Sequence, residues 1–213
     1  MEINDRFLDG STAILFATQL NKKELIEELI EQGADVNIAN NNNFKPIYMA
    51  VRNNNFEIVD ILLKAGAADY EALDYVQTKE MCDFLFSNGL NLNGINDHGE
   101  DVGTSAIHSE NTVFFDYVVS KGLDLSEALN FSIKNINIEN INKLLNNEHL
   151  ITFREEYLYN AYITRKPYIV SSIISKYDNE TIQRIKNKSL EDIEIIKKEN
   201  YNFGNEYEKY FRA

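Results

Sequence analysis

Apolar residues recur along the chain in short runs with helical spacing, and each run ends at a glycine. The four clearest runs and the glycines that follow them are residues 25–30, 56–63, 81–86 and 114–119, then Gly33, Gly66, Gly89 and Gly122. The first two glycines are 33 residues apart, as are the last two, whereas only 23 residues separate the middle two. Because glycine just past a helix permits a left-handed cap, the pattern predicts repeated helices with a period of 33 residues.

A shorter apolar segment precedes each of the first two runs. These segments are Thr12 to Ala17 and Lys45 to Ala50, and Pro46 suits the first turn of a helix. Each repeat is therefore predicted to be a helix–turn–helix unit. The interval of 23 residues is ten residues short, which predicts that the segment from Asp69 to Val76 runs almost directly into the next helix.

The pairing of helices is predicted to continue towards the C-terminus. The expected pairs are 126–134 with 138–145, then 157–164 with 168–174. After Asp178, isoleucine and leucine alternate with lysine and glutamate, which predicts amphipathic helices that cap the stack. We expect one array over residues 1–200, with about six helix pairs that are recognisable to residue 126 and divergent after it, and a tail at residues 201–213.

The best-preserved motifs resemble the ankyrin-repeat family. They are Asp9-Gly10-Ser11-Thr12-Ala13-Ile14-Leu15-Phe16-Ala17 with Gly33 to Asn37, and Lys45 to Ala50 with Gly66-Ala67. Leu15 and Tyr48 stand where the family has histidine. The resemblance implies an all-α helical solenoid with short β-hairpin fingers, in which some repeats are shortened and lack the finger. It places the asparagine runs 40–43 and 53–55 at turns, where asparagine tolerates positive φ.

Proteins of this family bind partners through finger tips and the exposed side of the inner helices, which together form a concave face. The matching positions of this chain are Asn41, Asn42, Phe44, Tyr48, Met49, Arg52 and Asn53, then Asp97, His98, Glu100, Thr104, Ser105, His108 and Ser109. Phe44 is either an aromatic anchor at a fingertip or folds back onto its own repeat. The twelve tyrosines add little, because tyrosine suits both interfaces and half-buried cores.

The chain is acidic, with 34 acidic and 21 basic residues and a net charge of −13. Such a surface repels phosphate backbones, so nucleic-acid binding is not expected. It favours a basic partner protein, although solubility alone also explains it. The N-terminal residues lack the pattern of a signal peptide and no segment suits a membrane span, so a cytoplasmic protein is expected.

None of the short motifs with a strong catalytic or phosphate-binding meaning occurs in the sequence. Cys82 lies on the apolar side of a helical pattern and is expected to be a buried structural thiol. The histidines, His98, His108 and His149, have no Cys or His partner at zinc-ligand spacing and are expected at the surface. We therefore expect no enzyme, no cofactor and no metal.

The leading hypothesis is a protein-binding module. A short acidic array suggests an inhibitor, such as an immunity protein or antitoxin that blocks a basic enzyme. The alternative is a scaffold or a host-directed effector adaptor with several partners, and a lesser alternative is an acidic mimic of nucleic acid. The oligomeric state stays open.

Overall fold

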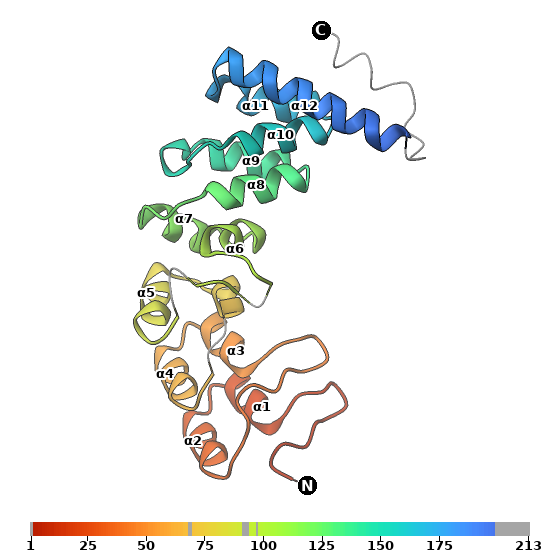
Figure 1. Cartoon of the computed structure of the whole chain (residues 1–213). Coiled ribbons are helices and arrows are strands. Elements are labelled where there is room, and N and C mark those ends of the chain that lie inside the picture. The colour runs from red at the N-terminus through yellow and green to blue at the C-terminus, as the bar shows by residue number, and fades with distance from the viewer. Residues whose placement is uncertain (1, 68–69, 91–93, 97, 199–213) are drawn as a thin grey trace. The chain divides into compact units, whose positions relative to one another are not determined.

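The computed structural model describes residues 2–67, 70–90, 94–96 and 98–198 of the 213-residue chain, with only the backbone for 193–198 (Figure 1). The chain divides into two compact units, Met1–Lys121 and Gly122–Ala213. We refer to them as unit 1 and unit 2. The predicted tail at 201–213 lies outside the described residues, and the single array over 1–200 stays a prediction.

The described residues of unit 1 form three pairs of α-helices and one pair whose first helix is replaced by a 3₁₀ helix. The elements are α1 (Ala13–Gln19), α2 (Lys23–Glu31), α3 (Pro46–Arg52), α4 (Phe56–Lys64), the 3₁₀ helix η1 (Tyr70–Tyr75), α5 (Lys79–Ser87), α6 (Val102–His108) and α7 (Thr112–Ser120). Figure 1 shows α2, α4 and α5 stacked on one side, while the first two hairpin loops project beyond α1 and α3 on the other. We call α1, α3, η1 and α6 the inner helices.

In the part of unit 2 that the structure describes, two helix pairs are followed by one long helix. The elements are α8 (Ser126–Lys134), α9 (Ile138–Leu145), η2 (Glu148–Leu150), α10 (Glu155–Ile163), α11 (Pro167–Ile173), η3 (Ile174–Lys176) and α12 (Asn179–Lys198). The two predicted pairs are confirmed. The prediction of several capping helices is wrong, because one 20-residue helix, α12, covers that segment and packs against α10.

The turn between the two helices of a pair has the same backbone geometry in both units. One residue has a left-handed φ of 52° to 58°, and the residue four positions earlier is small and buried. The left-handed residues are Asn21, Asn54, Glu110, Ile136 and Arg165, and the small ones are Ala17, Ala50, Ala106, Ser132 and Ala161. Because a small side chain lets neighbouring helices approach closely, the helix pairs of both units can pack through the same kind of turn.

Three hairpin loops in unit 1 correspond to the predicted fingers. In each, the first residue donates its N–H to the carbonyl four residues later, as from Asn40 to Phe44 at 3.0 Å and from Asn96 to Glu100 at 2.9 Å. The loops are hairpin 1 (residues 7–11), hairpin 2 (residues 40–44) and hairpin 3 (residues 96–100, except 97). Asn43, at φ 62°, confirms the predicted use of asparagine in these turns. The β-bridge found in the described residues is an isolated antiparallel one, between Ile95 and Asp101.

The shortened third repeat keeps its place in unit 1 through polar contacts. Its first helix is reduced to η1, and Thr78 caps α5 by accepting a hydrogen bond from the Met81 N–H at 3.2 Å. The side-chain amide of Asn111 donates to the carbonyls of Asp74 and Val76 at 2.9 and 3.0 Å. These bonds satisfy two carbonyls at the end of η1. The predicted shortening is confirmed.

Candidate functional site

A first groove lies between the hairpins and inner helices of the first two repeats. It encloses about 170 Å³ and is lined by Asp9, Ser11, Leu15, Gln19, Asn40, Phe44, Met49 and Arg52. Its apolar part comes from Leu15, Phe44 and Met49, with the Arg52 cation at the rim. The Asp9 carboxylate accepts hydrogen bonds from the Ser11 hydroxyl at 2.8 Å and the Ser11 N–H at 3.0 Å, which lower its pKa. The groove therefore combines some apolar surface with one charge of each sign.

Hairpins 1 and 2 are joined side by side above this groove. The Asn41 N–H donates to the Asp9 carbonyl at 2.9 Å, and the Asn41 side-chain amide donates to the Leu8 carbonyl at 3.2 Å. Gly10 has a φ of 78°, and a Cβ there would lie 2.8 Å from the Asn41 backbone nitrogen. Glycine is thus needed at this position for both its backbone angle and the close approach of hairpin 2. The arrangement leaves the Leu8 side chain fully exposed.

A second groove lies between η1, hairpin 3 and α6. It encloses about 150 Å³ and is lined by Glu71, Asp74, Asn96, His98, Glu100, Ser105, His108 and Ser109. Glu71 accepts a hydrogen bond from the Tyr48 hydroxyl at 2.7 Å and lies 3.1 Å from the His98 Nε2. Three carboxylates therefore line a small groove together with two imidazoles. Such a groove has the chemistry to accept a cation or a hydrogen-bond donor.

Glu100 joins hairpin 3 to α6 on the other side of the second groove. One carboxylate oxygen lies 2.8 Å from the His108 Nδ1, and the other accepts from the Asn96 amide at 2.9 Å. Asp101 caps α6 by accepting from the Thr104 N–H at 2.7 Å, which fixes the direction in which α6 leaves the hairpin. The sequence prediction brought His98, Glu100 and His108 to one place, and the structure does the same.

Tyr48 does not have the exposure that was predicted for it. Its side chain is 1% exposed, and its ring stacks on Tyr75 with centroids 5.2 Å apart. Tyr48 stands where the family has histidine. It lies in the core because its ring packs beside η1 and its hydroxyl reaches Glu71. Thr104 and Ser105 are also buried, since α6 carries small residues that pack closely. The predicted exposure of these three residues is wrong.

Phe44 follows neither of the two alternatives considered for it. It is half-buried, and its ring packs against Tyr75 of the next repeat with centroids 5.4 Å apart. It therefore closes one side of the first groove and does not project from the hairpin. The role of Phe44 in binding stays a prediction.

The remaining predicted positions lie at the surface of unit 1, except one. Asn41, Asn42, Arg52 and Asn53 are exposed, and Met49 is half-buried in the first groove. Asn53 donates to the Asn21 side chain at 3.3 Å and so links two successive turns. Asp97 lies outside the described residues.

Sequence reasoning missed Leu8 and the carboxylates of η1. Leu8 precedes Asn41 by one 33-residue period, so the repeat itself could have placed it at a hairpin tip. Glu71 and Asp74 carried no signal, because the segment that bears them lacks the pattern of an inner helix. The half-buried Tyr75 was missed for the same reason.

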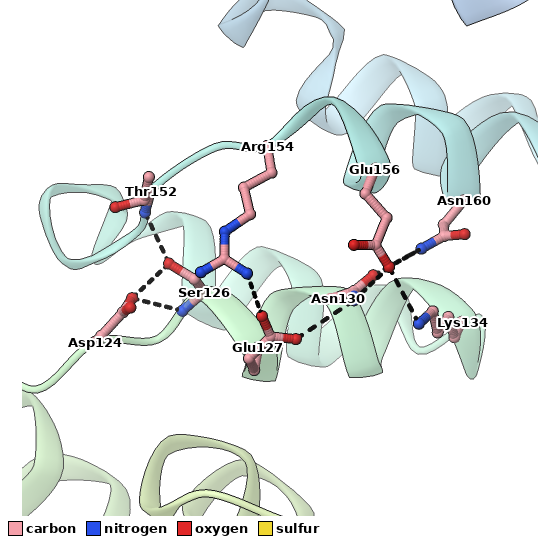
Figure 2. A network of polar contacts seen from close by, with 9 residues as sticks. All are labelled: Asp124, Ser126, Glu127, Asn130, Lys134, Thr152, Arg154, Glu156 and Asn160. Atoms are coloured by element: carbon pink, nitrogen blue, oxygen red, sulfur yellow. Dashed lines mark hydrogen bonds and ion pairs between the residues drawn. The ribbon is translucent and has the colours of Figure 1, made fainter. Parts of the chain in front are cut away.

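In unit 2, a polar network joins α8 to α10 and the residue before it (Figure 2). Buried Asn130 donates to Glu156 at 3.3 Å and accepts from the Asn160 amide at 2.8 Å. Lys134 lies 3.4 Å from the same Glu156, and Arg154 pairs with Glu127 at 2.5 Å. The network joins α8 to α10, and its charges have partners inside unit 2.

The part of the chain that the structure describes was also searched for metal sites, membrane-spanning helices and reactive thiols. No group of three or more His, Cys, Asp or Glu residues there has the arrangement of a metal site, and no helix there is long and apolar enough to cross a membrane. Cys82 is buried, and burial raises its thiol pKa to about 12. The prediction of a buried structural thiol is confirmed.

The comparison with known families agrees with this architecture. Residues 1–74 match the family model described as ankyrin repeats, three copies. Ankyrin repeats in general mediate protein–protein interactions and are typically not enzymes. Residues 1–74, in unit 1, are therefore ankyrin repeats, and the later helix pairs share their turn geometry.

Proposed function

We propose that the protein binds a partner protein through the hairpins and the two grooves of unit 1. The observation that carries the proposal is the fully exposed Leu8 at the tip of hairpin 1, next to Asp9 of the first groove. Phe7 next to it is also exposed, and its ring packs edge-on against Phe16. Single exposed apolar residues are common, but an adjacent pair at the rim of a groove suits an interface anchor.

The second groove supports a partner with a basic surface. Its carboxylates come from Glu71, Asp74 and Glu100, and the whole chain has a net charge of −13. A lysine or arginine side chain of the partner would complement this charge and could form bonds to carboxylate oxygens. The long-range field would also speed the encounter with a basic protein at low salt.

Of the three specific functions considered, inhibitor, scaffold and mimic of nucleic acid, the inhibitor fits these features best. Two small grooves near one another suit a single surface of one partner, whereas a scaffold needs separate surfaces for several proteins. A mimic of nucleic acid needs regularly spaced, solvent-facing carboxylates. Here Glu71 and Glu100 bond to tyrosine, histidine and asparagine side chains in one cluster. Such a cluster suits contact with a single group of the partner.

Affinity capture from extract of the native cell tests the proposal. The full chain is compared with Leu8→Ser and with Leu25→Ser, a control that removes an exposed leucine from α2 on the other side of unit 1. One stoichiometric partner that is lost with Leu8→Ser and kept with Leu25→Ser is the expected result. A partner that both variants retain would contradict the role of hairpin 1, and several independent partners would favour a scaffold.

A further inference from the structure

Each later repeat of unit 1 contacts the repeat before it through the N-cap residue of its outer helix. Asn55, the N-cap residue of α4, donates to the Asn21 side chain at 3.3 Å. Thr78, the N-cap residue of α5, donates to the Asn54 side chain at 3.3 Å. Asn111, the N-cap residue of α7, donates to two carbonyls of the shortened third repeat. The start of each of these helices therefore faces the preceding repeat.

Two further positions of the outer helices lie on the same side. The sixth residue after the N-cap contacts the preceding outer helix. Phe84 packs edge-on against Phe56 with centroids 5.3 Å apart, and the Tyr117 hydroxyl donates to Asp83 at 2.9 Å. The third residue after the N-cap is fully buried in α4, α5 and α7, where it is Ile58, Met81 and Phe114. Because residues three apart share a face of a helix, both positions belong to the surface that the preceding repeat covers.

In the first repeat, the same positions are exposed. Lys22 is the N-cap residue of α2, and Leu25 and Glu28 are the third and sixth residues after it. Leu25 is 44% exposed, whereas Ile58 at the same position of α4 is 1% exposed. Leu20, at the end of α1, is 64% exposed. Figure 1 shows α2 at the end of the stack of outer helices. We call Leu20, Lys22, Leu25 and Glu28 the end face, and no helix pair in the described residues covers it.

Leu20 belongs to the end face by the same period of 33 residues. Asn53, 33 residues later, donates to Asn21 of the preceding repeat at 3.3 Å. The end face therefore exposes two leucines at positions that face a neighbouring repeat elsewhere in unit 1. End repeats generally carry a polar outer surface, which keeps the array soluble. Two exposed leucines at these positions indicate that the end face is an interface.

The charges of the end face are arranged symmetrically about Leu25. Lys22 lies three residues before it and Glu28 three residues after it, about 4.5 Å along the helix in each direction. When two copies of α2 pack antiparallel with Leu25 against Leu25, Lys22 of each copy lies opposite Glu28 of the other. The Lys22 side chain has no partner in the described residues, and exposed Glu28 accepts only from the Gln32 amide there, at 3.2 Å. The end face is therefore complementary to itself.

We propose that two copies of the chain associate through their end faces, with a two-fold axis at Leu25. The second copy then takes the place that a preceding repeat has in the rest of unit 1, and two Lys22–Glu28 pairs flank the apolar centre. Each copy has a net charge of −13, and salt at about 0.15 M screens this repulsion beyond about 8 Å. Because the face is small, the dimer is expected to be transient.

The dimer does not depend on the proposed function. No residue of the end face lines either groove of unit 1. Leu25→Ser is for this reason still expected to retain the partner in affinity capture.

Sedimentation equilibrium of the full-length chain at about 0.15 M salt tests the dimer. We expect a dimer whose fraction rises with protein concentration. Leu25→Asp is expected to weaken it at least ten-fold, because the two-fold axis brings the new charge against its own copy. Lys22→Glu and Glu28→Lys are each expected to weaken it about ten-fold, because each replaces both ion pairs with like charges.

A mixture of the two charge variants separates a specific contact from a general charge effect. In a mixed pair, the two carboxylates of Lys22→Glu lie opposite the two ammonium groups of Glu28→Lys, and both ion pairs are restored. The equimolar mixture is expected to associate about ten-fold more tightly than either variant alone. Glu27→Lys is the matched control on α2. It makes the same charge change at the position where Asp83 of α5 contacts the following repeat, and it is expected to leave the dimer unchanged.

Several results would overturn the proposal. These are a chain that stays monomeric at every concentration, equal weakening by Glu27→Lys, or a mixture that associates no better than its components. Thermal melting checks that each variant folds, and Leu20→Ser, expected to weaken the dimer as well, replaces Leu25→Asp where that variant does not fold. A monomeric chain that loses its captured partner with Leu25→Asp would identify another protein as the occupant of the end face.

Discussion

The hydrogen bond from Tyr48 to Glu71 offers a direct measure of how firmly η1 is held against α3. Tyr48 is 1% exposed, its hydroxyl donates to Glu71 at 2.7 Å, and the Glu71 side chain is 23% exposed. A bond to a charged acceptor contributes about 1.5–3 kcal/mol when water cannot replace it. Because water reaches part of Glu71, we expect Tyr48→Phe to lower the free energy of unfolding by about 1–2 kcal/mol.

Tyr117 provides a matched control in the same unit. It is also buried, and its hydroxyl donates to Asp83 at 2.9 Å, but the Asp83 side chain is 55% exposed and also pairs with Lys121 at 2.7 Å. When the Tyr117 hydroxyl is removed, water and Lys121 can still bind the Asp83 carboxylate. Tyr117→Phe is therefore expected to cost less than about 1 kcal/mol, and clearly less than Tyr48→Phe.

Urea unfolding followed by circular dichroism measures both variants, and a double-mutant cycle with Glu71→Gln isolates the pair. We expect a coupling energy of about 1 kcal/mol between Tyr48→Phe and Glu71→Gln. A coupling below about 0.3 kcal/mol, or equal costs for Tyr48→Phe and Tyr117→Phe, would refute the reasoning. The shortened repeat would then be held by apolar contacts alone.

Other perturbations test the core, the hairpins and the titrating groups. Leu62→Ala in α4 should lower the free energy of unfolding by about 2–5 kcal/mol because Leu62 is fully buried, and by more than Leu63→Ala at the half-buried neighbour, as measured by urea unfolding. Ile136→Asn should stabilise unit 2 by about 1 kcal/mol, since a β-branched residue at a φ of 58° is strained and asparagine tolerates that angle; an unchanged melting temperature would contradict this. Cys82 should react with a thiol reagent only after unfolding, because burial raises its pKa to about 12, and rapid labelling of the native protein would disprove its burial. The Glu156 pKa is lowered, chiefly by the hydrogen bond from Asn130, so its stabilisation is complete above its ordinary value of 4.5 and lost as the pH falls through the lower folded value; Glu156→Gln should flatten the stability of unit 2 across that acidic range.

Local sequence chemistry was sufficient for the helices and their repeat. Glycine at positions such as Gly33 and Gly66 ends the outer helices in a left-handed cap, and asparagine takes a positive φ in the turn at Asn54. These preferences act within a few residues, so they can be recognised without knowing what packs around them. The helix pairs of unit 2 followed from periodicity alone, and their bounds at 126–134 and 138–145 are those of α8 and α9.

The sequence by itself determined the repeat, the fold class and the buried thiol of Cys82, because each depends on spacing along one helix or turn. The tertiary structure decided which side chains of the inner helices face solvent. Tyr48 is buried because η1, from a different repeat, supplies Tyr75 as a stacking partner and Glu71 as an acceptor. A pocket of unit 2 likewise exists only where α12 packs against α10, which brings Lys186 to the turn that carries Arg165 and Lys166, and no local pattern connects these two segments. Contacts between elements distant in the chain set the exposure and electric field of each site, and a one-dimensional period carries no information about them.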